Sequence, residues 1–129
     1  MLPGILGVAF TRAEPGLVEA RLTLDRRHLA PNGYLHAATI VAVADTACGY
    51  GCMASLPEGA DGFTTIELKS NFIGTQTEGS ISCRASLVHG GRTTQIWDAV
   101  VTNEATERTL ALFRCTQLIL RPEPTSPGS

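Results

Sequence analysis

The chain has 129 residues and a formal net charge of −2, with ten Lys and Arg against twelve Asp and Glu. A chain of this length forms one domain that can bury a core of its own. The slightly acidic balance, with no run of basic residues, excludes a nucleic-acid-binding protein.

The apolar segments and the cysteines bear on location and cofactors. The longest apolar run, residues 35–44, is too short to cross a bilayer and ends at Asp45. The first ten residues lack the charged start of a signal peptide, so we expect a cytoplasmic protein without a membrane partner. The cysteines fit no metal-ligand spacing, and we expect reduced, buried thiols and no metal or redox cofactor. These are Cys48, Cys52, Cys83 and Cys115.

The first half of the chain predicts two strands and one long helix. Residues 5–10 form a first strand, and a Glu-Pro-Gly turn at 14–16 precedes residues 17–24, in which apolar and polar side chains alternate. A loop with an Asn-Gly turn follows. In residues 36–55 Ala, Ile, Val, Cys and Met dominate, which predicts a helix that is apolar nearly all round and therefore buried.

The second half predicts four sequential antiparallel strands joined by short turns. They span residues 63–73, 79–88, 93–102 and 110–120. We therefore expect a single α+β domain over residues 1–120, in which a curved antiparallel sheet covers the long helix. The free edges of such a sheet favour association of copies. The Pro- and Ser-rich tail at 121–129 is expected to be disordered.

Asp45 is the residue that stands out, because it is a carboxylate inside an apolar helix. Burying an ionised carboxylate is costly unless it is paired or hydrogen-bonded, and groups that bear this cost often mark working sites. The alternative is a structural aspartate that hydrogen-bonds within the fold.

The segment "PNGYLHAATIVAVADTACGYG" resembles the hotdog-fold acyl-CoA thioesterases, in particular their PaaI-like branch, and the resemblance extends over about residues 5–120. The family pattern is Gly-x-x-His-Gly-Gly with an acidic residue soon after it. Gly33, His36 and Asp45 fit this pattern, whereas Ala37 and Ala38 replace the two glycines.

The resemblance implies the roles of four residues. Asp45 would be the general base or the nucleophile, at a dimer interface. The Ala37 N–H, at the positive start of the helix, would polarise the thioester carbonyl as an oxyanion hole. Thr65, or Thr64 if the register differs by one, would hydrogen-bond the water or the carboxylate, unless it is an ordinary strand residue. His36 would either fix the loop through a backbone carbonyl, which we favour, or lie against the thioester.

Two further groups would bind substrate. Many relatives carry Asn or Gln six residues before the histidine, where this chain has Ala30. Asn32 and Gly33 are close to that position, and the Asn-Gly pair is also a plain turn former.

The second group is the segment Gly90, Gly91 and Arg92. It is similar to the family's hairpin near the coenzyme A nucleotide, and an arginine beside exposed backbone N–H groups suits phosphate. A simple hairpin is the alternative interpretation.

The sequence thus predicts an acyl-CoA thioesterase that releases a free acid and CoA, acting as a homodimer or homotetramer. Two alternatives share the fold: a non-catalytic binder of acyl-CoA or acyl-carrier thioesters, and a hydratase that uses His36 and Asp45. The residues do not define the acyl group, which is aryl or aliphatic.

Overall fold

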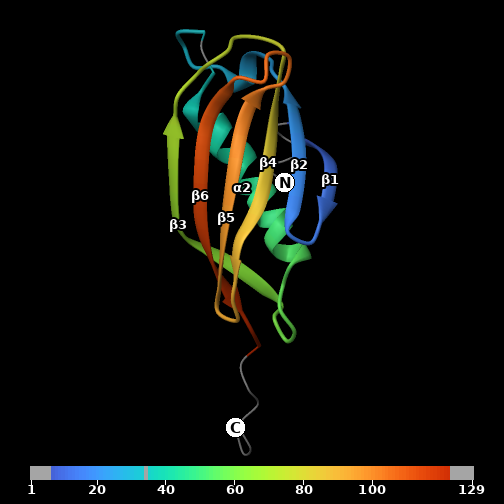
Figure 1. Cartoon of the computed structure of the whole chain (residues 1–129). Helices are drawn as coiled ribbons and strands as arrows, with labels where there is room; N and C mark the ends of the chain where they lie inside the picture. Colours follow the sequence, from blue (N-terminus) through green and yellow to red (C-terminus); the bar gives the residue numbers. More distant parts are fainter. Residues whose placement is uncertain (1–6, 34, 123–129) are drawn as a thin grey trace, which may run out of the picture.

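A computed structural model describes residues 7–33 and 35–122 (Figure 1). Its strands are β1 (Ala9–Glu14), β2 (Leu17–Thr23), β3 (Gly62–Phe72), β4 (Ser80–Gly90), β5 (Thr94–Asn103) and β6 (Thr109–Leu120). Its helices are the single 3-10 turn η1 (Arg26–His28) and α2 (Ala37–Ala54), which has 18 residues.

The strands form one antiparallel sheet in the order β1-β2-β4-β5-β6-β3, and α2 lies against one face of it (Figure 1). β3 follows α2 in the chain but pairs with β6 at the far side of the sheet. The edge of β3 that faces away from β6 has no strand beside it in the described part of the chain. The predicted curved sheet around one long helix is confirmed.

The first strand was predicted at the wrong residues. The prediction placed it at 5–10, whereas β1 begins at Ala9 and continues to Glu14, paired with β2. Residues 5 and 6 lie outside the described residues, as do residues 123–129 of the predicted disordered tail. β1 is an edge strand whose side chains are nearly all exposed, so it carries no alternating apolar pattern from which its end could be inferred.

The prediction that α2 is buried nearly all round is wrong for the single chain. One side packs on the sheet through Ile40, Val43, Ala44, Ala47, Cys48, Gly51 and Cys52. The other side is open, and Tyr50 and Met53 on it are 44% and 52% exposed. By length and hydropathy α2 would also suffice to cross a bilayer, but a core helix meets the same criterion.

The packing of α2 depends on a glycine beneath the one tryptophan. Trp97 is fully buried and Gly51 is buried beside it, so a Cβ at Gly51 would lie 2.4 Å from the nearest Trp97 ring atom. The Trp97 Nε1–H donates to Gln95 Oε1 (2.8 Å), and Gln95 Nε2 donates to the Ser55 carbonyl oxygen (2.8 Å). This chain of bonds fixes the end of α2 to the sheet.

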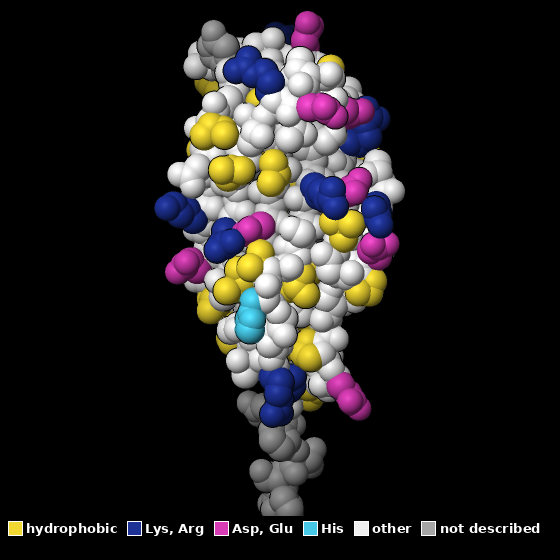
Figure 2. Space-filling model, viewed as in Figure 1, with side chains coloured by type: hydrophobic (Ala, Val, Ile, Leu, Met, Phe, Trp, Pro, Cys, Tyr) yellow, Lys and Arg dark blue, Asp and Glu magenta, His cyan; other side chains and the backbone are white. Residues whose placement is uncertain are grey.

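The face of the sheet away from α2 carries apolar and charged side chains together (Figure 2). Val88, Leu112, Leu118 and Leu120 are exposed there. Arg114 makes a bidentate ion pair with Asp98, at 2.5 and 2.8 Å. This outer face therefore leaves large apolar side chains uncovered in the single chain.

Candidate active site

Asp45 lies on the open side of α2, at the edge of an apolar cavity of about 380 Å³. The other lining residues are Thr46, Gly49, Tyr50, Met53 and Phe63. The carboxylate is half-buried, and burial raises the pKa of Asp45 above its ordinary value. No described residue forms a hydrogen bond or an ion pair with the Asp45 carboxylate. The structure therefore gives no support to a purely structural, hydrogen-bonded aspartate.

The start of α2 is capped by His36. The His36 backbone is extended (φ −71°, ψ 132°), and its Nδ1 accepts from the Ala38 N–H at 3.0 Å. The sequence suggested instead that His36 fixes the loop through a backbone carbonyl. Ala37 is exposed, and no acceptor for its N–H is found among the described residues. This N–H can therefore donate to a bound oxygen.

One chain does not bring Ala37 and Asp45 to the same reacting atom. They are eight residues apart on one helix, which corresponds to roughly 12 Å along its axis. A carbonyl oxygen on the donor and a water on the base must each lie within about 3 Å of their partners. The two groups therefore do not form a complete site within one chain, and the position of Asp45 at a dimer interface stays a prediction.

Thr65 is half-buried and hydrogen-bonded to a fully buried glutamine. Its Oγ1 donates to Gln117 Oε1 (2.7 Å), and Gln117 Nε2 lies 3.4 Å from Cys115 Sγ. Thr64 is exposed and paired with Leu118. Neither threonine lines the Asp45 cavity. Thr64 and Thr65 are therefore not among the residues that surround the Asp45 carboxylate in one chain.

The Asn32-Gly33 segment forms the turn before α2. Gly33 has φ 85°, and its N–H donates to the Ala30 carbonyl oxygen (2.9 Å). Ala30 and Gly33 border a second cavity, of about 390 Å³, with Arg26, Leu29 and Pro31. The turn is thus shaped by its glycine, while Ala30 contributes only a methyl group where relatives have an amide.

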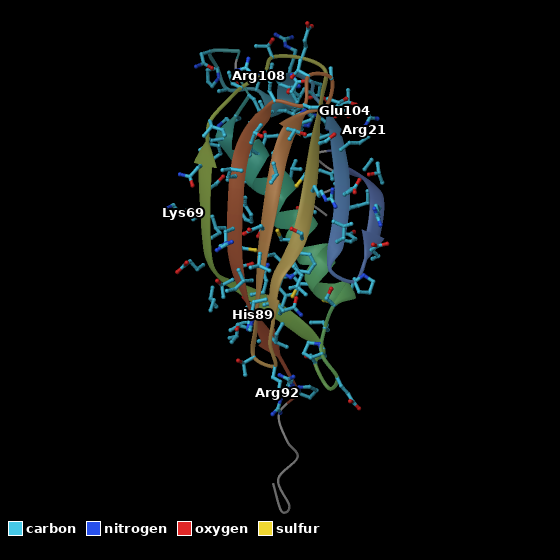
Figure 3. The ribbon with its side chains drawn as sticks, in the orientation of Figure 1. Arg21, Lys69, His89, Arg92, Glu104 and Arg108 are labelled. Carbon is cyan, nitrogen blue, oxygen red and sulfur yellow. The ribbon has the colours of Figure 1, made fainter. Side chains whose placement is uncertain are left out.

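Gly90, Gly91 and Arg92 form the hairpin between β4 and β5, where Figure 3 shows Arg92 at the end of the sheet. Arg92 is exposed, and the Arg121 guanidinium donates to its carbonyl oxygen. Two arginines therefore meet at this end, which is also the end at which α2 stops (Figure 1).

The cysteines lie in the core as free thiols, as predicted. Burial raises the pKa of Cys52 to about 11 and that of Cys83 to about 12. Cys52 and Cys83 are therefore thiols rather than reactive thiolates at neutral pH. Among the described residues no group of three or more His, Cys, Asp or Glu side chains could hold a metal ion.

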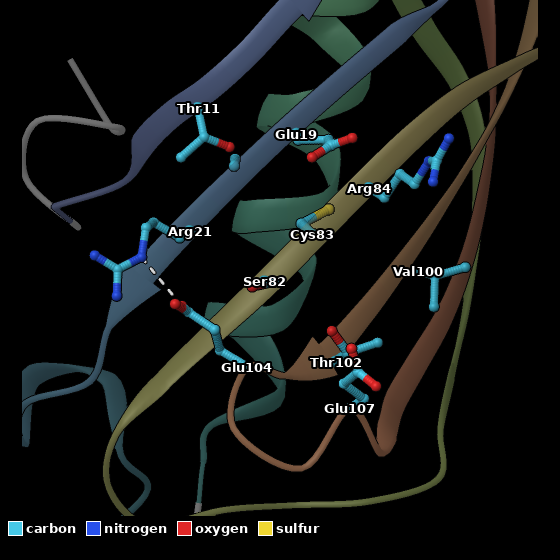
Figure 4. Close-up of a pocket in the computed structure, with 11 residues that line it drawn as sticks. Thr11, Glu19, Arg21, Ser82, Cys83, Arg84, Val100, Thr102, Glu104 and Glu107 are labelled. Carbon is cyan, nitrogen blue, oxygen red and sulfur yellow. Dashed lines mark hydrogen bonds and ion pairs between the residues drawn. The ribbon is translucent and has the colours of Figure 1, made fainter.

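A larger cavity, of about 700 Å³, lies on the face of the sheet away from α2 (Figure 4). Arg21 Nε and Glu104 Oε2 form an ion pair across it at 3.1 Å, and Arg21 also donates to Ser80 Oγ. It holds neither Asp45 nor the start of α2. The Arg21–Glu104 ion pair is exposed to solvent, so we assign this cavity no chemistry.

Sequence reasoning missed two residues that shape the start of α2. His28 is fully buried, and its carbonyl oxygen accepts from the His36 N–H (2.9 Å) and from the Thr39 hydroxyl (3.1 Å). No sequence pattern distinguishes His28 from an ordinary loop histidine, because the two bonds use its backbone.

The family profile of the thioesterase superfamily matches residues 32–110, which include the turn, the whole of α2, the strands β3, β4 and β5, and the start of β6. The chain belongs to the thioesterase superfamily. Its antiparallel sheet around one helix is the hotdog fold of these enzymes.

Individual thioesterases and a related acyl-CoA hydrolase are similar to this chain in sequence or in structure. A 1,4-dihydroxy-2-naphthoyl-CoA hydrolase of Listeria monocytogenes is 29% identical over 86% of this chain and 89% of its own. The proofreading thioesterase EntH of Klebsiella pneumoniae is 32% identical over 80% and 74%. A solved thioesterase family protein of Silicibacter pomeroyi is 30% identical with a TM-score of 0.85, covering 94% of this chain and 90% of that one. A thioesterase of Staphylococcus aureus is 26% identical with a TM-score of 0.87, covering 94% and 98%.

Proposed function

We propose that this thioesterase hydrolyses an acyl-CoA thioester to the free acid and CoA, with Asp45 as its general base or nucleophile. The observation that carries the proposal is the Asp45 carboxylate, half-buried beside an apolar cavity and without a partner among the described residues. A raised pKa makes a carboxylate a stronger base, and the cavity offers space for an acyl group.

Two reaction courses fit this carboxylate. As a base, Asp45 takes a proton from water while the water oxygen attacks the acyl carbon. As a nucleophile, its oxygen attacks that carbon to form an anhydride, which water then hydrolyses. In both, the thioester oxygen becomes negative and accepts from the Ala37 N–H, and the C–S bond breaks as the CoA sulfur leaves and is protonated.

The separation of Ala37 and Asp45 along α2 requires a second copy. We propose that two chains pair through the open side of α2 and the free edge of β3, with antiparallel helices, so that the Ala37 N–H of one faces the Asp45 of the other. The apolar side chains Ile66, Leu68 and Phe72 are exposed on β3 and suit such an interface. The exposed leucines of the outer face would supply the second contact of a tetramer.

The relatives support the choice of Asp45. The Staphylococcus aureus thioesterase has been crystallised as a Gln→Ala and as a Glu→Ala variant. The two replaced positions are fifteen residues apart in that protein, as Ala30 and Asp45 are in this chain. The Listeria monocytogenes relative is named for an acyl-CoA substrate, which favours CoA as the thiol. We place the reaction in the cytoplasm, with no metal or redox cofactor.

The CoA phosphates would bind at the β4–β5 hairpin. Arg92 is exposed there, and Arg121 lies against its carbonyl oxygen. Two guanidinium groups at one hairpin suit a phosphate.

The loss of an amide at Ala30 and of two glycines at Ala37 and Ala38 favours one rival, a protein that binds acyl thioesters without cleaving them. A panel of short, medium, long and aromatic acyl-CoA substrates, with detection of the free thiol, separates the two. A crotonyl-type thioester in the same panel tests the hydratase. Binding of acyl-CoA without release of thiol would establish the binder.

A complementation experiment tests the shared site. Ala37→Pro removes the N–H, and proline is favoured at the first helical position after an extended residue such as His36. We expect it and Asp45→Asn each to fold and to lose most activity. Refolded together, half of the dimers contain one of each, and each of these has one intact site. Activity should return to about a quarter of wild type. No return would exclude a site shared between chains.

A further inference from the structure

The first turn of α2 leaves one amide available, and His36 determines which one. The first four N–H groups of a helix, counted from its N-cap, have no ordinary helical acceptor, and here they belong to residues 36–39. The Ala38 N–H donates to His36 Nδ1 (3.0 Å). The Thr39 and Ile40 N–H groups donate to the His36 carbonyl oxygen (3.0 and 3.4 Å). Only the Ala37 N–H has no acceptor among the described residues.

His36 is itself held by the loop before it. Its N–H donates to the His28 carbonyl oxygen (2.9 Å), and the buried Thr39 hydroxyl donates to the same oxygen (3.1 Å). The His28 side chain is fully buried, and its Nδ1 accepts from the Asp25 N–H (2.9 Å). The acceptor oxygen therefore lies on a residue that cannot easily move.

We propose that the His28 carbonyl, the Thr39 hydroxyl and the His36 imidazole form a clamp that aims the Ala37 N–H at the thioester oxygen, which makes His36 and Thr39 positioning residues. The inference rests on the proposed function, because the N–H acts only on a bound thioester. An error of about 1 Å in the position of a reacting group can cost roughly 100-fold in rate. The clamp fixes the donor before substrate arrives.

The clamp also determines which nitrogen of the neutral His36 ring carries the proton. A nitrogen that accepts a hydrogen bond carries no proton, so the neutral ring holds its proton on Nε2. The clamp thus uses Nδ1, whereas a ring that touched the thioester directly would use Nε2.

Two substitutions of His36 distinguish a role of Nδ1 from a role of Nε2. His36→Asn places an amide oxygen near the position of Nδ1, and asparagine is a good N-cap. His36→Gln places its amide near the position of Nε2 and is a poor cap. We expect His36→Asn to keep kcat within about threefold of wild type, and His36→Gln and His36→Ala to lower it at least tenfold with little change in KM. Retention in His36→Gln with loss in His36→Asn would overturn the clamp, as would equal loss or equal retention in both.

A second, independent pair of substitutions tests the Thr39 hydroxyl. Thr39→Val keeps the branched shape and removes the hydroxyl, whereas Thr39→Ser keeps the hydroxyl. We expect kcat to fall at least tenfold in Thr39→Val and to stay within about threefold in Thr39→Ser, with KM nearly constant. A fall in both, or in neither, would refute the role of the hydroxyl.

Amide hydrogen exchange, measured by NMR, distinguishes failure of the clamp from failure of the proposed function. The Ala38 amide should exchange faster in His36→Gln than in wild type or His36→Asn. If wild type cleaves no thioester, the proposed function fails, and the exchange rates still decide whether the clamp exists. Equal exchange of Ala38 in all three proteins would show that it does not.

Discussion

Asp45→Asn should lower the rate of hydrolysis and leave the fold intact. The substitution keeps the shape of the side chain and removes its charge. A general base contributes about 10²–10⁴-fold, or about 3–5 kcal/mol of the barrier. Because no described residue donates to the Asp45 carboxylate, the variant loses no hydrogen bond. We therefore expect kcat to fall by that factor while the circular dichroism spectrum and the oligomeric state stay those of wild type.

The same variant should be as stable as wild type at neutral pH, or more stable. Burial raises the pKa of Asp45, so the folded state prefers the protonated form more than the unfolded state does. The favourable contribution of Asp45 is then fully present below the unfolded pKa, and it is lost as pH rises through the folded pKa. The Tm of Asp45→Asn should equal or exceed that of wild type at pH 7, and any excess should vanish as pH falls below about 4.

Thermal melts and kcat measured on the same samples distinguish a catalytic Asp45 from a structural one. Asp61→Asn is the matched control, because Asp61 is an exposed aspartate in the loop after α2, and it should change neither kcat nor Tm. A structural aspartate would give the opposite pattern, with Tm lowered at neutral pH and kcat per folded chain preserved. That result would refute both the base and the nucleophile.

Three further outcomes are expected. Gly51→Ala should lower the free energy of unfolding by about 1–3 kcal/mol in chemical denaturation, because its Cβ would lie 2.4 Å from the Trp97 ring. Gly49→Ala is the matched control in the same helix, since its Cβ would lie 3.1 Å from half-buried Phe63, and it should change stability by less than about 1 kcal/mol. Arg92→Ala should raise KM for acyl-CoA with kcat nearly constant, by a factor that shrinks as salt is added; an unchanged KM would leave a plain hairpin. Light scattering at micromolar concentration should show a dimer or tetramer, and a monomer would contradict the shared site.

The fold could be predicted from the sequence because one segment alternates as a strand does and another has the length and composition of a buried helix. Residues 17–24 alternate as β2 does, and the Ala-rich segment at 36–55 has the length and composition of a helix. Both patterns arise from burial against the same core. Where burial is absent the pattern fails, as in β1, whose exposed side chains gave no sign that the strand continues to Glu14.

The site was predictable in part. Asp45 could be singled out as a candidate because a carboxylate among apolar residues is conspicuous in any helix. Thr65 was placed by likeness to a strand, and only the structure shows that its hydroxyl faces Gln117. The clamp at His28 was beyond sequence reasoning, since a backbone carbonyl looks the same at every residue. Groups that act through their side-chain type can be predicted, whereas groups that act through their position cannot.

The open side of α2 links assembly to chemistry. Asp45 shares this side with the exposed side chains Tyr50 and Met53, so a second copy that covers them also removes water from around the carboxylate. In the proposed dimer, this further loss of water would raise the pKa of Asp45 and its strength as a base, and the same contact would supply the Ala37 N–H of the second copy. Both effects depend on one interface. Activity per chain should therefore fall on dilution over the concentration range in which light scattering shows dissociation. Constant activity through that range would mean that each chain holds a complete site.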